Sequence, residues 1–165
     1  MMKAYIRNKQ RSVKVNQQKT VKLLRKALHL LGLQRAELSI LFVNDRAIKL
    51  LNRTFRGVDK TTDVLSFPQQ ENYKLQYKKG SQLKSSLRTP NSALRTPHFV
   101  LGDIVINLQR AKRQAIEQGI TLNEELKRLI IHGLLHLLGY DHEKSRYQKD
   151  KMESKERELL KALES

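Results

Sequence analysis

Cysteine and tryptophan are absent from this 165-residue sequence, and the absence of cysteine excludes several classes of protein. The chain has no disulfide scaffold, no thiolate ligand for zinc or an iron–sulfur cluster, and no thiol nucleophile. Aromatic residues make up only 5% of the chain, so aliphatic side chains must form most of the core. No apolar run approaches the roughly 20 residues that span a bilayer, and the first residues lack the apolar stretch of a secretory signal. These absences favour a cytoplasmic protein that does not associate with membranes.

Acidic residues are scarce: there are 16 of them against 33 Lys and Arg, which gives a formal net charge of +17. The excess is concentrated, since residues 1–36 contain ten basic residues and no acid, and residues 72–98 contain six and no acid. Segregated positive charge is typical of proteins that bind polyanions, and nucleic acid is the favoured partner. The alternative is a solvated basic surface. In the second segment the candidate RNA contacts are Lys74, Lys78, Lys79, Lys84 and Arg88.

Hydrophobic periodicity predicts an α+β fold in a single domain covering residues 1–165, with a small, mostly mixed sheet packed against about five helices. Gly80, Pro90, Pro97 and several serines lie among uncompensated basic residues, and this composition predicts a basic mobile loop at about 70–98. The predicted strands cover residues 3–9, 37–43, 62–67 and 99–106. The predicted helices cover residues 17–31, 45 (as a cap) to about 57, 107–118, 121 to about 139 and 147–163.

Three of the five histidines lie within eleven residues, in the pattern His-x3-His-x5-His. His132 and His136 are four residues apart on a predicted helix, so their rings lie one above the other on one face. His142 would lie on roughly the opposite face if the helix continued. Gly139 permits the left-handed backbone that ends a helix and turns the chain back. The pattern therefore predicts a metal site at the end of this helix; the alternative is three unconnected histidines.

The chemistry of this motif points away from peptide hydrolysis. The metzincin zinc proteases share the two helical histidines, the glycine and the third histidine, but they carry their general base, a glutamate, where this chain has Gly133. Three neutral imidazoles leave zinc its full charge and one open position, where water is activated. In so basic a protein, these features favour cleavage of phosphodiesters. A purely structural zinc is the alternative, although structural sites usually have four protein ligands.

The segment from His132 to His142 resembles the signature of the YbeY family of bacterial endoribonucleases. Residues 55–68 (FRGVDKTTDVLSFP) resemble its second block, with Thr61 where the family commonly has proline, and residues 101–106 (LGDIVI) resemble its third. The resemblance covers about residues 36–160. It implies a single-strand-specific, zinc-dependent endoribonuclease that acts in the cytoplasm, with ribosomal RNA and the ribosome or its proteins as partners. The implied roles are maturation of the 3′ end of small-subunit ribosomal RNA and ribosome quality control.

The resemblance also implies roles for individual residues, with Arg56 and His132 as catalytic residues. A guanidinium near the metal can bind a phosphate through two hydrogen bonds and stabilise developing charge. The alternative for Arg56 is a structural pair with Asp59 or Asp63. The implied ligands of a single zinc ion are His132, His136 and His142.

Two acidic residues complete the candidate site. Asp141 either orients a ligand ring or shapes the turn between the second and third histidines. Asp103 is expected to bond the backbone near the site rather than to take part in catalysis. Besides the nuclease, two other functions stay open: a ribosome assembly factor with a structural metal and little catalysis, and a metallopeptidase.

Overall fold

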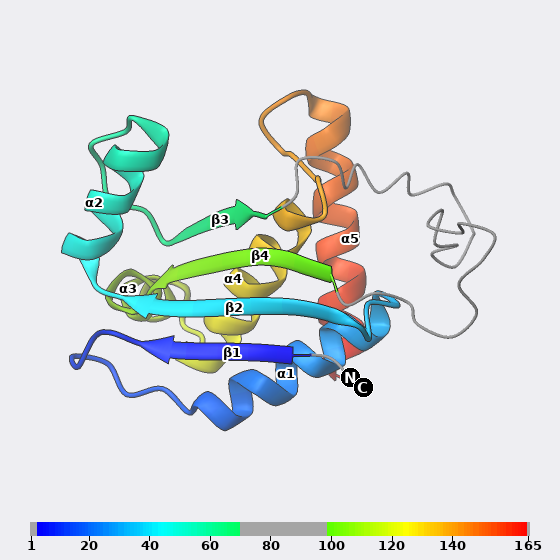
Figure 1. Ribbon diagram of the computed structural model, residues 1–165, viewed down its shortest axis with the longest axis horizontal. Helices are drawn as coiled ribbons and strands as arrows, with labels where there is room; N and C mark the ends of the chain where they lie inside the picture. Colours follow the sequence, from blue (N-terminus) through cyan, green and yellow to red (C-terminus); the bar gives the residue numbers. More distant parts are fainter. Residues whose placement is uncertain (1–2, 70–98, 165) are drawn as a thin grey trace.

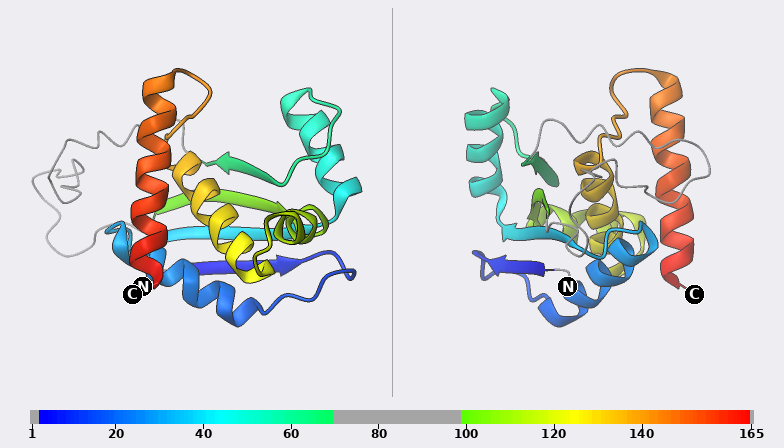
Figure 2. Two further views of the ribbon diagram at one scale, coloured as in Figure 1. Left: turned by 180° about the vertical axis from the view of Figure 1, so that it is seen from behind. Right: turned by 45° about the vertical axis from the view of Figure 1, so that its right-hand side comes forward.

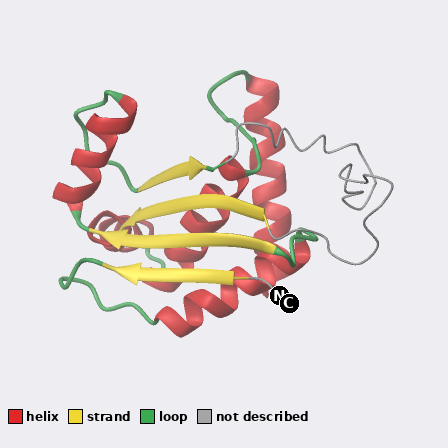
Figure 3. Cartoon of the chain, in the orientation of Figure 1, coloured by secondary structure: helices red, strands yellow, loops and turns green. Residues whose placement is uncertain are grey.

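The computed structural model describes residues 3–69 and 99–164, and within these ranges it contains a four-stranded sheet and five helices (Figures 1 and 3). The predicted α+β fold with a mixed sheet and about five helices is confirmed. The strands are β1 (Lys3–Asn8), β2 (Ala36–Val43), β3 (Val64–Pro68) and β4 (Phe99–Asn107). The helices are α1 (Gln17–Leu30), α2 (Asp45–Arg56), α3 (Leu108–Gln118), α4 (Leu122–Leu137) and α5 (Arg146–Glu164).

Two sequence predictions fall on residues 70–98, which lie outside the described ranges. These are the basic mobile loop and its five candidate RNA contacts, Lys74, Lys78, Lys79, Lys84 and Arg88. Among the helices that are described, none carries an apolar stretch that could span a bilayer.

The sheet has the strand order β1-β2-β4-β3, in which β1, β2 and β4 are parallel and β3 is antiparallel to β4. The register of β2 against β4 shifts after Glu37, where the next pair joins Leu38 to Gly102. Gly102 has a φ of 144°, and a Cβ there would lie 2.2 Å from the carbonyl oxygen of Phe67 on β3. Only glycine therefore lets β3 approach β4 closely at this point.

Helices cover the two faces of the sheet unequally (Figure 2). The larger core lies under α1, α3, α4 and α5 and is almost entirely aliphatic, as the scarcity of aromatic residues predicts. It includes Leu28, Ile104 and Leu134, all fully buried. On the opposite face α2 packs its Ile48 against Leu65 and neighbouring strand residues in a smaller cluster. The sheet thus separates α2 from α4, although both helices contact β3.

The start of α2 differs from the sequence prediction, because Asn44 rather than Asp45 caps the helix. Asn44 has an extended backbone, and its side chain accepts a hydrogen bond of 2.9 Å from the N–H of Ala47. Asp45 is already helical, and both of its oxygens accept hydrogen bonds from Arg113, at 2.8 and 2.9 Å. The carboxylate therefore joins α2 to α3 instead of capping α2.

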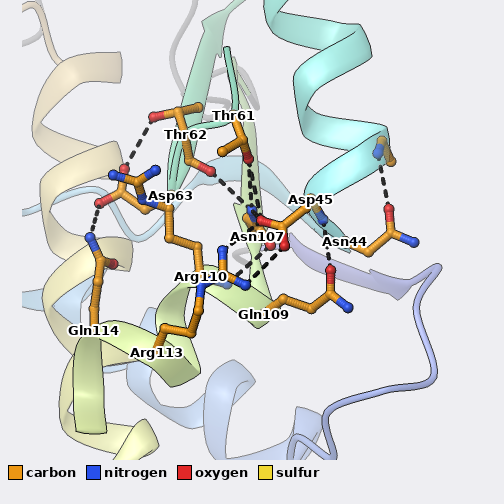
Figure 4. Close-up of polar contacts among 11 residues, drawn as sticks. Asn44, Asp45, Thr61, Thr62, Asp63, Asn107, Gln109, Arg110, Arg113 and Gln114 are labelled. Carbon is orange, nitrogen blue, oxygen red and sulfur yellow. Dashed lines mark hydrogen bonds and ion pairs between the residues drawn. The ribbon is translucent and has the colours of Figure 1, made fainter. Parts of the chain in front are cut away.

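A buried asparagine organises the polar contacts around Asp45 (Figure 4). Asn107 is fully buried at the end of β4, and its side-chain N–H groups donate to Asp45 at 2.7 Å and to the carbonyl of Thr62 at 3.1 Å. Its side-chain oxygen caps α3 by accepting from the N–H of Arg110 at 3.2 Å. These bonds fix the segment between α2 and β3, and so help to fix how Arg56, the last residue of α2, lies relative to the sheet.

Candidate metal centre

The helix that carries two of the three histidines begins as the sequence predicts. Thr121 and Glu124 form a capping box: the Thr121 hydroxyl accepts from the N–H of Glu124 at 3.2 Å, and the Glu124 carboxylate accepts from the N–H of Thr121 at 2.7 Å. From this start α4 runs to Leu137. His132 and His136 therefore lie near its C-terminal end.

The chain reverses direction directly after α4, and Gly139 makes the reversal. Gly139 has a φ of 87°, in the left-handed region that favours glycine. Its N–H donates to the carbonyl of His136 at 3.0 Å, and the N–H of Tyr140 donates to the carbonyl of Leu135 at 3.0 Å. These paired bonds end the helix and turn the backbone toward it. His142 is thereby returned to the first two histidines, which confirms the sequence prediction.

The three imidazole rings form a compact triangle. Their centroids are 4.8 Å apart for His132 and His136, 5.3 Å for His132 and His142, and 5.0 Å for His136 and His142. One nitrogen from each ring can be chosen so that all three atoms lie within 4.8 Å of one another. The Nε2 atoms of His132 and His136 are only 3.2 Å apart. In the described part of the chain, these histidines are the group that could hold a metal ion.

The state of the individual rings fits metal binding. Burial, together with the neighbouring His132 and His142, lowers the pKa of His136 from 6.5 to about 4. His136 is therefore neutral at physiological pH, with a lone pair available for a metal. The Nδ1 atom of His142 is buried and has no hydrogen-bond partner among the described residues, as expected of a nitrogen whose partner is a metal. Three neutral imidazoles are a donor set suited to zinc.

A fourth side chain, which the sequence analysis missed, contacts the triangle of rings. Glu156 of α5 lies beside His132, with its Oε2 atom 3.4 Å from the ring Nδ1. Because Glu156 is 24 residues from His132 and on another helix, no local motif reveals the contact. One signal was available: Glu156 falls between Met152 and Leu159 on the stripe of α5 that faces the core. An acidic residue on such a stripe needs a partner.

Comparison with known proteins assigns the chain to a family. The family model described as endoribonuclease YbeY matches residues 5–164. The chain belongs to the YbeY family. The match extends the resemblance from about 36–160 to nearly the whole chain, including the basic N-terminal part.

Relatives named endoribonuclease YbeY support the same assignment. The Aquifex aeolicus protein is 41% identical over 150 residues, which cover 91% of this chain and 85% of the relative. The Persephonella marina protein is also 41% identical, over 85% of this chain and 78% of the relative. The solution structure of TM1509 from Thermotoga maritima has the same fold, with a TM-score of 0.61, 24% identity, and coverage of 99% of this chain and 89% of that one.

Arg56, which the resemblance implies to be catalytic, is exposed at the end of α2. Its guanidinium has no ion pair or hydrogen bond to another described residue. Asp59 instead lies 3.8 Å from the Lys49 amine, and Asp63 accepts hydrogen bonds from the N–H of Val64 and from Gln114. The alternative for Arg56, a structural pair with Asp59 or Asp63, is therefore not formed, and the guanidinium is available to a ligand.

Strand β3 contacts both the arginine-bearing helix α2 and the histidine-bearing helix α4. Phe55, next to Arg56, places its ring edge-on to that of Phe67 on β3, with centroids 5.3 Å apart. The neighbouring Ser66 hydroxyl donates a hydrogen bond of 3.1 Å to the carbonyl of Gly133, a residue that lies between the two helical histidines in the sequence. Side chains alternate along a strand, so Phe67 faces α2 and Ser66 faces α4. Both helices are thus anchored to one short strand.

Gly133 also shows why this YbeY chain cannot follow the zinc-protease arrangement. A Cβ at this position would lie 2.9 Å from a methyl group of Ile104 and 3.2 Å from the Ser66 hydroxyl. The position therefore faces the sheet, where α4 packs closely, and no room is left for a glutamate. This geometry disfavours the metallopeptidase alternative independently of the missing carboxylate.

Asp141 makes its described contacts within the turn between Gly139 and α5. Its Oδ1 atom accepts from the N–H of Glu143 at 2.9 Å, and its Oδ2 atom lies 3.6 Å from the Lys144 amine. The hydrogen bond from the Glu143 N–H, followed by the charge of Lys144, lowers the pKa of Asp141. These contacts lie within the turn; the two alternative roles of Asp141, shaping the turn or orienting a ligand ring, both stay predictions.

Asp103 lies on β4 beside the site rather than in it. It accepts hydrogen bonds from the Ser39 hydroxyl and, at 2.8 Å, from the Gln69 amide. Its partners are thus side chains, where the sequence analysis expected backbone. The adjacent Ile104 faces α4, so Asp103 faces the α2 side of the sheet. Its supporting role stays a prediction.

Proposed function

We propose that this protein is a single-strand-specific, zinc-dependent endoribonuclease that holds one zinc ion per chain. The convergence of His132, His136 and His142 carries the proposal, and the relatives named as endoribonucleases support it. Imidazole is a preferred zinc ligand, and three protein ligands are typical of catalytic sites, which keep a position open for water or substrate. A structural zinc would more often have four ligands, several of them cysteines, and the chain has no cysteine.

The chemistry of the proposed site suits a reaction on a phosphodiester. When bound, a zinc ion supplies a Lewis acid that polarises a phosphoryl oxygen or activates water. Neutral imidazoles add no negative charge, so they do not repel the substrate's phosphate. Arg56 binds the non-bridging phosphate oxygens and stabilises the charge that develops on them. We assign catalysis to Arg56 and to the ligand His132, with Asp141 and Asp103 in supporting positions.

We further propose that the substrate is ribosomal RNA in the cytoplasm, and that the enzyme acts in maturation of the 3′ end of the small-subunit RNA and in ribosome quality control. The net charge of +17 supports a polyanionic substrate bound on or near the ribosome. The basic segment 72–98 supplies contacts to the single strand, through Lys74, Lys78, Lys79, Lys84 and Arg88.

Cleavage of a defined single-stranded RNA by His136→Ala tests the proposal. His29→Ala is the matched control, because His29 is exposed on α1 and far from the cluster in sequence. We expect His136→Ala to lose cleavage while it keeps its fold and its RNA affinity, and His29→Ala to cut like the wild type. If well-folded His136→Ala still cuts, cleavage does not depend on the zinc site and the proposal is wrong; a wild-type protein that binds zinc but cuts no RNA is instead an assembly factor with a structural metal.

The ends of the RNA products identify the nucleophile. Attack by water leaves simple phosphate ends, whereas attack by the neighbouring 2′-hydroxyl leaves a cyclic phosphate. End-group analysis of a cleaved oligonucleotide separates the two.

A casein assay tests the metallopeptidase alternative. We expect no hydrolysis, because Gly133 leaves no place for the general base.

A further inference from the structure

We propose that Glu156 of α5 is a positioning residue for the metal centre: its carboxylate orients the ring of His132 so that Nε2 faces the ion. The inference rests on the metal site of the proposed function. Its basis is the contact between the Nδ1 atom of His132 and the Oε2 atom of Glu156, at 3.4 Å. The two residues come from helices α4 and α5, which pack against each other.

Burial distinguishes Glu156 from the other acids of α5. Its side chain is 13% exposed, whereas those of Glu153 and Glu158 are 52% and 66% exposed. It lies on the same helical stripe as Met152 and Leu159, both of which are buried in the core. A carboxylate in such a position loses hydration, and this loss is costly unless a hydrogen bond replaces the lost water.

The contact determines which nitrogen of His132 carries the proton. An ionised carboxylate only accepts hydrogen bonds, so the Nδ1 atom of His132 must donate, which leaves the lone pair on Nε2. That Nε2 atom lies 3.2 Å from the Nε2 atom of His136. The ring of His136 is held in a similar way, through a hydrogen bond to the backbone of Tyr140. Metal-binding histidines commonly have a carboxylate or a carbonyl on the second nitrogen.

A purely structural explanation would pair Glu156 with a nearby cation. Arg128, one turn before His132 on α4, is the candidate. Its guanidinium donates hydrogen bonds of 3.0 and 2.6 Å, from Nε and Nη2, to the fully buried Glu125. These bonds are the main cause that raises the pKa of Arg128, and the charge of Glu156 adds a smaller contribution without a hydrogen bond. Among the described residues, His132 is the hydrogen-bond partner of Glu156. The carboxylate is therefore directed at the cluster.

Zinc affinity measured by competition with a chromophoric chelator tests the inference. We expect Glu156→Leu to bind zinc about 10- to 100-fold more weakly than the wild type, the range for loss of such a partner. Glu156→Gln keeps an acceptor oxygen and should lose less than about 10-fold. Glu158→Gln, on an exposed position of the same helix, is the matched control and should bind like the wild type.

The ring of His132 provides a second readout that a structural role would not change. Long-range proton–nitrogen NMR spectra of the full-length, zinc-free protein should show the proton on Nδ1 in the wild type and in Glu158→Gln. In Glu156→Leu the two tautomers should mix. Circular dichroism verifies that each variant is folded. If Glu156→Leu does not fold, Glu156→Gln replaces it in both measurements.

Wild-type zinc affinity and an unchanged His132 spectrum in folded Glu156 variants would overturn the inference and leave only a helix contact. The proposed function fails separately. If zinc affinity depends on Glu156 but the wild-type protein cuts no RNA, the inference about Glu156 holds and the proposed nuclease function is wrong. A wild-type protein that binds no zinc would overturn both.

Discussion

Replacing Gly139 with alanine tests whether the left-handed turn holds His142 in the cluster. Gly139 has a φ of 87°, and an L-residue in this region costs roughly 1–2 kcal/mol. Gly139 is exposed, so we expect the cost to lie in its left-handed backbone. The metal-free variant is able to relax the turn, whereas metal binding requires the turn to re-form.

The strain should therefore be measured as lost metal affinity. A cost of roughly 1–2 kcal/mol corresponds to about 5- to 30-fold weaker zinc binding by Gly139→Ala in a chelator competition. Gly139→Asn should recover most of the affinity, since asparagine adopts the left-handed conformation more readily than alanine.

Gly119→Ala is the matched control for the same backbone strain. Gly119 has a φ of 64° at the end of α3, and a Cβ there would meet nothing within 4 Å. This variant should lower the melting temperature by roughly 2–8 °C, with zinc affinity unchanged. If Gly139→Ala binds zinc as tightly as Gly119→Ala, the turn is not what returns His142 to the cluster, and that reasoning is wrong.

Three further predictions concern the arginine, a carboxylate and the basic segment. Arg56→Ala should slow RNA cleavage by about 10²- to 10³-fold without a change in melting temperature. Arg53→Ala, at an exposed position of the same helix, should cleave RNA at the wild-type rate. Equal cleavage rates for the two variants would show that Arg56 takes no part in the mechanism. The hydrogen bond from Arg113 is the main cause that lowers the pKa of Asp45 from 3.8 to about 2. This carboxylate therefore stabilises the fold above pH 4 and loses its effect as the pH falls toward 2. Because its side chain is 37% exposed, we expect it to contribute about 1 kcal/mol to the free energy of unfolding. The stability of Asp45→Asn should accordingly change less with pH over this window in acid unfolding experiments. If Asp45→Asn unfolds with the same pH dependence as the wild type, solvent screens the pair of Asp45 and Arg113 completely. Deleting residues 74–95 should weaken RNA binding and reduce its salt dependence by a slope of about 0.7 for each phosphate that the segment neutralises, and an unchanged slope would mean that the segment does not touch RNA.

Most of the secondary structure and the clustering of the three histidines could be predicted from sequence because both depend on local rules. The capping box at Thr121 and the glycine after α4 are signals over a few residues, and the spacing of His132 and His136 follows from helix geometry. The return of His142 could be inferred because a glycine at that point favours the left-handed backbone of a tight reversal. These parts of the site needed no knowledge of the sheet.

The features that sequence reasoning missed depend on contacts between distant segments. The position of Glu156 beside His132 requires the packing of α5 on α4, which residue spacing along the chain does not reveal. The strand order β1-β2-β4-β3 and the close approach of Gly133 to Ile104 are likewise tertiary. Asn44 replaced Asp45 as the cap because Arg113, 68 residues away, engages the aspartate.

Zinc stoichiometry in single-histidine variants tests most directly whether three imidazoles hold one ion. The full-length wild type and the control His29→Ala should each contain one zinc ion per chain after purification and removal of loosely bound metal. Separate alanine variants of His132, His136 and His142 should each lose it while circular dichroism shows the fold intact. A full equivalent of zinc in folded His142→Ala would contradict a centre built from all three rings.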